Sequence, residues 1–258
     1  MKRRNTFCLS TAAVLVSVLS AAALGPHEIL LLVNTNSQRS IDIAAAYARL
    51  RSVPESNIVR LGIPSEQAVA SVVMSRDEFT RLIWTPASAA ARERGIDDHI
   101  LAWIYSVDFP TRISTDPAIS IQGITFTRNK LVDAELVRRG SWKSPLFTSP
   151  ANPTGRFHPS QSFNVSRGWL GEDMPLPSMT LGFAGERGNS KTAILECLGR
   201  GVKSDRTRPA GTIYFLTGED VRAKARQWQF PAAQQRLSSL GVASVITNAV
   251  PPGRTNII

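Results

Sequence analysis

Two kinds of hydrophobic pattern alternate along the chain. Nearly continuous apolar runs predict buried strands over residues 28–33, 57–61, 99–107, 211–218 and 243–247. Segments with apolar residues every three or four positions predict five helices. One helix ends near Arg51 and another begins at Ser75. The other three cover 124–139, 190–199 and 219–240. Strands that alternate with helices in this way predict an α/β fold with a mostly parallel, doubly wound sheet and helices on both faces.

Local signals refine several of these elements. Ser75 and Glu78 fit a capping box, in which each side chain satisfies a main-chain amide at the helix start. Pro86 is expected to kink or split the helix that follows, because proline lacks the N–H that the helix needs. The helix ending near Arg51 is expected to face the core through Ile41, Ala44, Ala45 and Ala48.

The segment from Ser141 to Thr180 has no clear periodicity. It holds six prolines and five Trp or Phe residues, which disordered linkers usually lack. It is predicted to be an irregular Pro- and aromatic-rich insertion, either a recognition surface over the sheet or an excursion whose aromatic side chains pack on the body.

The N-terminus has the order of a secretory signal. Lys2, Arg3 and Arg4 precede an uncharged stretch over 7–24 that ends in small residues. We therefore expect residues 1–25 to be a signal peptide and 26–258 to be one α/β domain, periplasmic or extracellular. The alternative is a retained membrane anchor; after cleavage no stable membrane span is expected.

The chain is basic, and loss of the three basic residues of the signal would lower its formal charge from +10 to +7. The Lys and Arg residues are scattered, and no nucleic-acid-binding signature is present, so no nucleic-acid partner is expected. An anionic envelope polymer remains a possible partner.

Polar side chains follow the first predicted strand. Asn34, Asn36 and Ser37 could bind a ligand at the start of a helix, where the dipole favours an anion. The alternative is structural: Ser37 or Ser40 caps the helix and the asparagines form a turn. The loop lacks the glycines of a dinucleotide site, so no cofactor is predicted.

A second polar group follows the strand over 99–107. Ser106, Asp108 and Arg112 lie where a parallel sheet commonly places catalytic carboxylates. Asp108 is either an acid/base group or a structural residue that caps a turn or pairs with Arg112.

The stretch GERGNSKT at 185–192 nearly matches a phosphate-binding loop, but Ser190 replaces the second glycine. A tight turn that ends in a helix cap is favoured over a phosphate site. Arg187 and Asn189 from this stretch remain candidate ligand contacts.

Two further candidates follow the strand over 211–218. Asp220 and Arg222 could reach the same crevice as Asp108, although an acidic residue also suits a helix start without any ligand.

A cysteine–histidine site is the remaining catalytic possibility. Cys197 could pair with His27, His99 or His158, but its place beside Leu198 predicts a buried packing role. No nucleophile elbow and no metal-binding motif is present, so no metal is predicted.

Several stretches together resemble an uncharacterised family of exported bacterial proteins. These are ILLLVNTNSQRSIDIAAAYARLRSVPESNIVRL, LAWIYSVDFPTRI, LGFAGERGNSKTAI, GTIYFLTGEDVRAKARQ and PAAQQRLSSLGV. The resemblance implies export and a flavodoxin-like α/β core, but no activity. Members of that family have a longer segment before the position of Thr180 and often continue past this C-terminus, so a truncated domain is one expectation. A distant likeness to caspase- and gingipain-like peptidases concerns strand order only, since their catalytic positions are not found here.

The leading functional hypothesis is a non-catalytic, exported or envelope-associated domain that binds a small polar ligand, a glycan or a peptide. One alternative is a hydrolase in which Asp108 is the acid/base and Arg112 or Arg187 stabilises an anion. The other is a truncated, non-functional member of its family.

Overall fold

A computed structural model describes residues 24–64, 73–139, 141–142, 175–184, 188–205, 207 and 211–249. The chain divides into two compact units, Met1–Gly199 and Arg200–Ile258, which are described separately below. Residues 1–23 of the predicted signal peptide and most of the predicted insertion lie outside the described residues. The single domain predicted over 26–258 stays a prediction.

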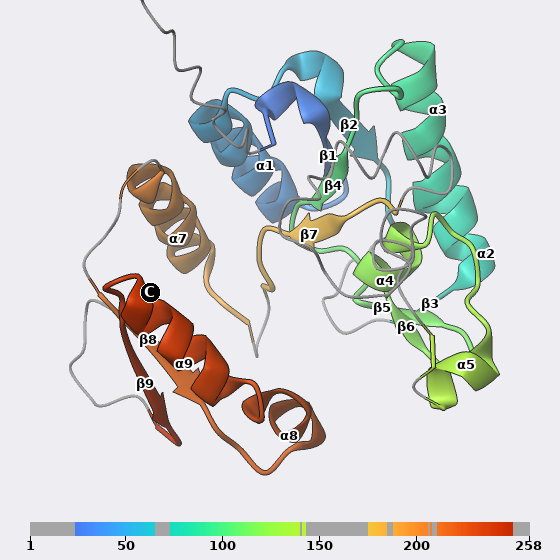
Figure 1. The fold of residues 1–258 in the computed structure, drawn as a ribbon. Coiled ribbons are helices and arrows are strands. Elements are labelled where there is room, and N and C mark those ends of the chain that lie inside the picture. The colour runs from blue at the N-terminus through green and yellow to red at the C-terminus, as the bar shows by residue number, and fades with distance from the viewer. Residues whose placement is uncertain are drawn as a thin grey trace, which may run out of the picture. The chain divides into compact units, whose positions relative to one another are not determined.

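A four-stranded parallel sheet forms the centre of the first unit (Figure 1). Its strands are β1 (Ile29–Asn34), β2 (Ile58–Leu61), β4 (Ala102–Tyr105) and β7 (Ser178–Thr180), in the order β2-β1-β4-β7. In register, Leu31 of β1 lies between Ile58 of β2 and Ile104 of β4. All residues of β1 and β4 are buried, as strands covered on both faces must be.

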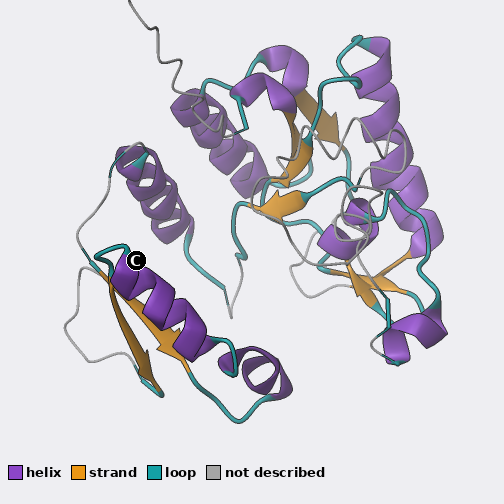
Figure 2. Cartoon of the chain, viewed as in Figure 1, coloured by secondary structure: helices purple, strands orange, loops and turns teal. Residues whose placement is uncertain are grey.

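Helices cover both faces of this sheet (Figure 2). α1 (Gln38–Arg51) and the first part of α7 (Lys191–Ser204) pack on the face of Leu31 and Ile104. The opposite face is covered by the continuous helical run of α2 (Arg76–Phe79), a π-helical turn η4 (Thr80–Trp84) and α3 (Thr85–Glu93), together with α4 (Ile121–Phe126). The predicted mostly parallel α/β fold is therefore confirmed.

A small second sheet was not predicted. It joins β3 (Val73–Ser75), β5 (Arg112–Ser114) and β6 (Ile119–Ser120), in the order β3-β5-β6. Each strand has only two or three residues, and such short segments carry too little alternation to be recognised in a sequence. The other short helices among the described residues of this unit are η1 (Pro26–Glu28), η2 (Glu55–Asn57) and α5 (Ala134–Arg138).

The capping box is present, whereas Pro86 does not split the helical run, which continues through a π turn into α3. Ser75 Oγ accepts from the Glu78 N–H, and the Glu78 carboxylate accepts from the Ser75 N–H. Pro86 has no N–H for the carbonyl of Leu82, and the helix passes through the π turn just before it, where the Thr85 N–H donates to the Thr80 carbonyl.

The helix predicted over 124–139 is wrong as one element. α4 ends at Phe126 and α5 begins at Ala134, because Arg128 and Asn129 take left-handed backbone angles, with φ of 53° and 59°. Two consecutive left-handed residues end any right-handed helix.

Two predicted packing faces also need correction. In α1, Ile43, Ala44 and Ala46 are buried, whereas Ala45 is exposed. An alanine-rich helix has little contrast between its faces, so the pattern alone fixes its rotation poorly. Cys197 is exposed rather than buried, because α7 meets the sheet through Ile194 and Leu198, four residues apart.

The second unit contains β8 (Thr212–Leu216), α8 (Val221–Gln227), α9 (Phe230–Ser239) and β9 (Ala243–Thr247). β8 and β9 pair in parallel, and the rings of Phe215 and Phe230 stack with centroids 5.0 Å apart. No described residue from Arg200 onward is buried.

Among the helices that the structure describes, none combines the length and the apolar character that crossing a bilayer requires.

Candidate functional site

The loops after β1 and β4 meet at the carboxyl edge of the parallel sheet. The first loop ends in Ser37, the N-cap of α1, whose Oγ accepts from the Ser40 N–H at 3.1 Å. Ser37 has extended backbone, with φ −126° and ψ 112°, which is the usual conformation of an N-cap. The alternative that a serine of this loop caps the helix is therefore confirmed, and the capping residue is Ser37.

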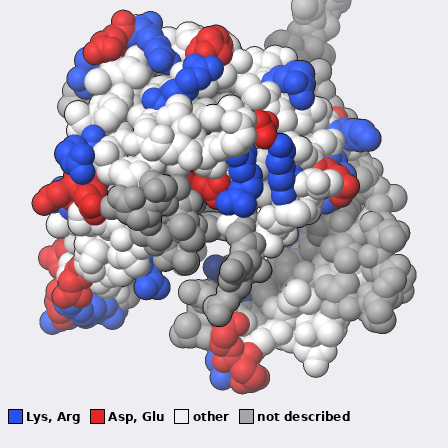
Figure 3. All heavy atoms as spheres, turned by 180° about the vertical axis from the view of Figure 1, so that it is seen from behind, with Lys and Arg blue, Asp and Glu red and all other residues white. Residues whose placement is uncertain are grey.

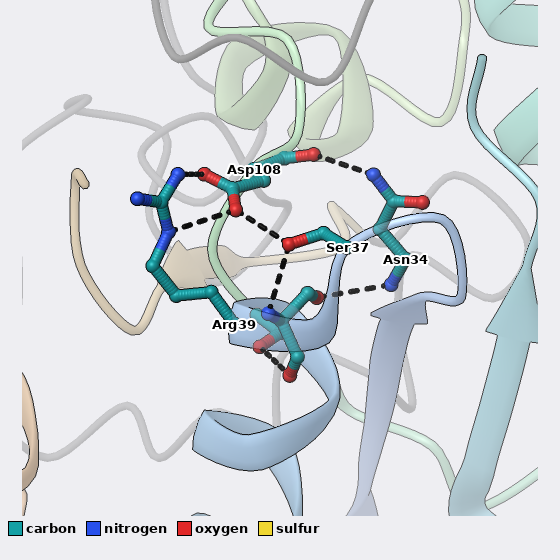
Figure 4. Close-up of polar contacts among 6 residues, drawn as sticks. Asn34, Ser37, Arg39 and Asp108 are labelled. Atoms are coloured by element: carbon teal, nitrogen blue, oxygen red, sulfur yellow. Dashed lines mark hydrogen bonds and ion pairs between the residues drawn. The ribbon is translucent and has the colours of Figure 1, made fainter. Parts of the chain in front are cut away.

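Asp108 is the centre of the contact between the two loops (Figure 4). The residue is 5% exposed and has a left-handed backbone, with φ 62°. Its Oδ2 accepts from Ser37 Oγ at 2.6 Å and from Arg39 Nε at 3.0 Å, and its Oδ1 accepts from Arg39 Nη2 at 2.8 Å. These hydrogen bonds to Asp108 raise the pKa of the Arg39 guanidinium above its ordinary value.

Asn34 connects the same loops through its side-chain amide. Its Nδ2 donates to the Asp108 carbonyl at 2.9 Å, and its Oδ1 accepts from the main-chain N–H groups of Asn36 at 3.0 Å and Ile63 at 3.3 Å. Asn34 is fully buried, so each of these bonds satisfies a group that has no access to water.

Two serines complete the network under Asp108. The Ser40 Oγ accepts from the Asn34 N–H at 3.1 Å, and the Ser106 Oγ donates to the Ser40 carbonyl at 2.7 Å. Both are fully buried. The structure therefore brings together five of the residues singled out in the sequence, namely Asn34, Asn36, Ser37, Ser106 and Asp108.

The other candidates lie elsewhere or outside the description. Arg112 belongs to β5 of the small sheet and is exposed, and the ion pair of Asp108 is with Arg39. Asn189 is exposed and donates its N–H to the Phe183 carbonyl at 2.7 Å. Arg187 lies outside the described residues.

Asp220 and Arg222 belong to the second unit. Asp220 Oδ1 accepts from the Ala223 N–H at 3.2 Å, which is the helix-start role that needs no ligand. The side chain of Arg222 is outside the description.

Arg39 is the site residue that sequence reasoning missed. It is the second residue of α1, and its side chain is 42% exposed against 4% for Asp108. A single arginine among the many scattered basic residues carries no distinctive signal. The helix dipole favours an anion in the first turn and so gives no reason to expect a functional cation there. Its role as the partner of Asp108 can be recognised only from the fold, which brings the two side chains together.

The carboxylate of Asp108 is held in a structural arrangement. Both oxygens accept charge-assisted or hydroxyl hydrogen bonds. A general base must present an oxygen to substrate, and Asp108 is only 5% exposed. The group that this arrangement presents to a ligand is the Arg39 guanidinium, which Asp108 holds in place at the carboxyl edge of the sheet.

The cysteine and histidine candidates do not form a dyad in the described chain. Cys197 lies on the exposed side of α7, while the rings of His27 and His99 lie 6.4 Å apart at the opposite, amino end of the sheet. His158 is outside the description. Nor do any three His, Cys, Asp or Glu side chains within the described ranges gather in a way that could hold a metal ion.

On the face in Figure 3, the basic side chains of the described residues are interspersed with acidic ones. Among the described residues on that face, neither sign of charge forms an uninterrupted patch.

Comparisons with known proteins add no relative: no family model matches the chain, and neither the curated proteins nor the solved structures contain a match.

Proposed function

We propose that this chain is a non-catalytic binding domain that recognises a polar ligand, a glycan or a peptide, at the carboxyl edge of its parallel sheet. The observation that carries the proposal is the ion pair of Asp108 with Arg39, in which two hydrogen bonds hold a half-exposed guanidinium beside the N-terminus of α1. Open α/β sheets bind ligands at this edge.

Arg39 is suited to a ligand contact because it is already ordered. A guanidinium has five N–H donors, and the two bonds to Asp108 use two of them. Since Asp108 holds the side chain, less conformational entropy is lost when a ligand binds. The ligand group that suits this guanidinium is a hydrogen-bond acceptor, such as a carboxylate or a hydroxyl.

The hydrolase alternative is less well supported. A proton accepted from substrate would neutralise the almost fully buried Asp108 carboxylate and so weaken its three hydrogen bonds with Ser37 and Arg39.

The proposed location is outside the cytoplasm, in the periplasm or beyond. The basic, apolar and small-residue order of residues 1–25 supports export, as does the resemblance to exported bacterial proteins. Membership of that family is proposed on the stretches between residues 29 and 242 that carry the resemblance.

A ligand panel tests the binding function. The melting temperature of residues 26–258 is measured with acidic and neutral oligosaccharides and with acidic and neutral peptides, because a ligand of the folded state raises it. A shift that Arg39→Gln abolishes is the expected result. Arg49→Gln is the matched control, since it removes the same charge from an exposed position of the same helix.

Two outcomes would contradict the proposal. One is a panel that produces no shift at millimolar concentrations. The other is hydrolysis of a panel member by the wild type that disappears in Asp108→Asn while the protein remains folded.

A further inference from the structure

A cavity of about 200 Å³ opens at the other end of the sheet from Asp108. Asp97 and Ile100, which precede β4, and Trp103 near its start contribute to the lining. Asp108 follows the carboxyl end of the same strand. The cavity is therefore separate from the candidate site described above.

Two tryptophans form one wall of the cavity. Their indole rings lie with centroids 5.0 Å apart and planes tilted by 35°, and Trp103 is almost fully buried whereas Trp84 is partly exposed. Trp84 is the last residue of the π-helical turn. Such turns are rare and occur frequently at functional sites, and here the turn delivers an aromatic side chain to a cavity. Buried Ile100 and Leu176 supply further apolar surface.

Apart from Ala91, the rest of the lining is polar. Its basic residues are Arg92 on α3 and Arg128 after α4, and its acidic residue is Asp97. Arg128 has a left-handed backbone, with φ 53°, directly after the C-cap of α4.

The size of the cavity limits the ligand. A water molecule takes up about 30 Å³ of liquid, so the space corresponds to about six or seven waters, enough for one ring with a short substituent and too little for a nucleotide. Indole walls favour a flat aromatic ring, and guanidinium groups favour a carboxylate. We propose that this cavity is a binding site for a single-ring aromatic carboxylate.

Titration of the folded protein with phenylacetate tests the proposal, with calorimetry and tryptophan fluorescence as readouts. Saturable binding is expected, with a fluorescence change because Trp84 and Trp103 line the cavity. The neutral phenylacetamide should bind about tenfold more weakly, because it lacks the charge that the guanidinium groups attract.

Three variants locate the binding. Arg92→Gln should weaken phenylacetate binding about tenfold, and Ser88→Leu should abolish it by filling the cavity from α3. Arg81→Gln removes the same charge from an exposed position of the same helical run outside the cavity lining and should have no effect. Arg39→Gln should also have no effect, which separates this site from the proposed function.

The proposal is overturned if the folded wild type shows no saturable binding of phenylacetate, benzoate or indole-3-acetate at millimolar concentrations. It is equally overturned if phenylacetamide binds as well as phenylacetate, or if Ser88→Leu, shown to be folded by its melting curve, still binds with wild-type affinity.

Discussion

At the scale of single residues, the backbone and the side chain of Asp108 serve the same contact. Its left-handed φ directs its carbonyl to the Asn34 amide while its carboxylate meets Ser37 and Arg39. Aspartate tolerates this conformation better than most residues, because its short side chain bonds locally. An unfavourable backbone angle is thereby stabilised by four hydrogen bonds.

Ser37 should be more important for stability than an ordinary helix cap. It accepts from the Ser40 N–H and donates to buried Asp108, whereas the corresponding two bonds of Ser75 with Glu78 are both exposed. We expect Ser37→Ala to lower the free energy of unfolding by about 2 kcal/mol and Ser75→Ala by about 1 kcal/mol. Denaturant unfolding of the two variants checks this order, and equal losses would contradict the role given to the contact with Asp108.

At the scale of helices and strands, the long buried elements were predictable and the short ones were not. The strands at 29–34 and 243–247 and the helix ending at Arg51 follow directly from apolar runs and periodicity. β7 and β3 depend on neighbours far away in sequence. Local pattern contains no information about such partners.

The candidate site was predictable to a similar extent. The polar residues after β1 and β4 could be located because parallel strands place their carboxyl ends at one edge. The pairing of Asp108 with Arg39, rather than with Arg112, spans 69 residues and could not be read from spacing.

A salt bridge between α1 and α7 gives the first unit a contact that depends on pH. The Lys191 ammonium on α7, and secondarily the Gln38 amide, donate to Asp42 on α1 and lower the pKa of Asp42 below its ordinary value. The contact therefore stabilises the folded state at neutral pH, and its contribution is lost as pH falls below about 4 through the lowered folded pKa.

Asp42→Asn should accordingly melt below the wild type at pH 7, by a small margin because the pair is exposed. The difference should disappear toward pH 2. Melting temperatures across this range, with Lys191→Gln as the matched variant, provide the test. A difference that persists unchanged at pH 2 would mean that the ion pair is not its source.

At the scale of the whole molecule, the described core belongs to one of the two units. Both clusters of buried apolar side chains consist of residues between Ile29 and Ile194. The described residues from Arg200 onward include none that is buried. Burial of apolar surface is the main source of folding stability. We therefore expect the two units to differ in their ability to fold independently.

A fragment of residues 24–204 should therefore unfold cooperatively by itself, and a fragment of residues 205–258 should not. Circular dichroism melting curves of the two fragments test this expectation. A sharp transition in the short fragment, or none in the long one, would contradict the assignment of the core.

The central claim is that Asp108 anchors Arg39 and Ser37 rather than performing chemistry. A double-mutant cycle of Asp108→Asn and Arg39→Gln on the free energy of unfolding tests it most directly. We predict a coupling of about 1 kcal/mol, which allows for the half-exposed guanidinium. Losses that add to within about 0.3 kcal/mol would show that the pair does not act as a unit and would contradict the account.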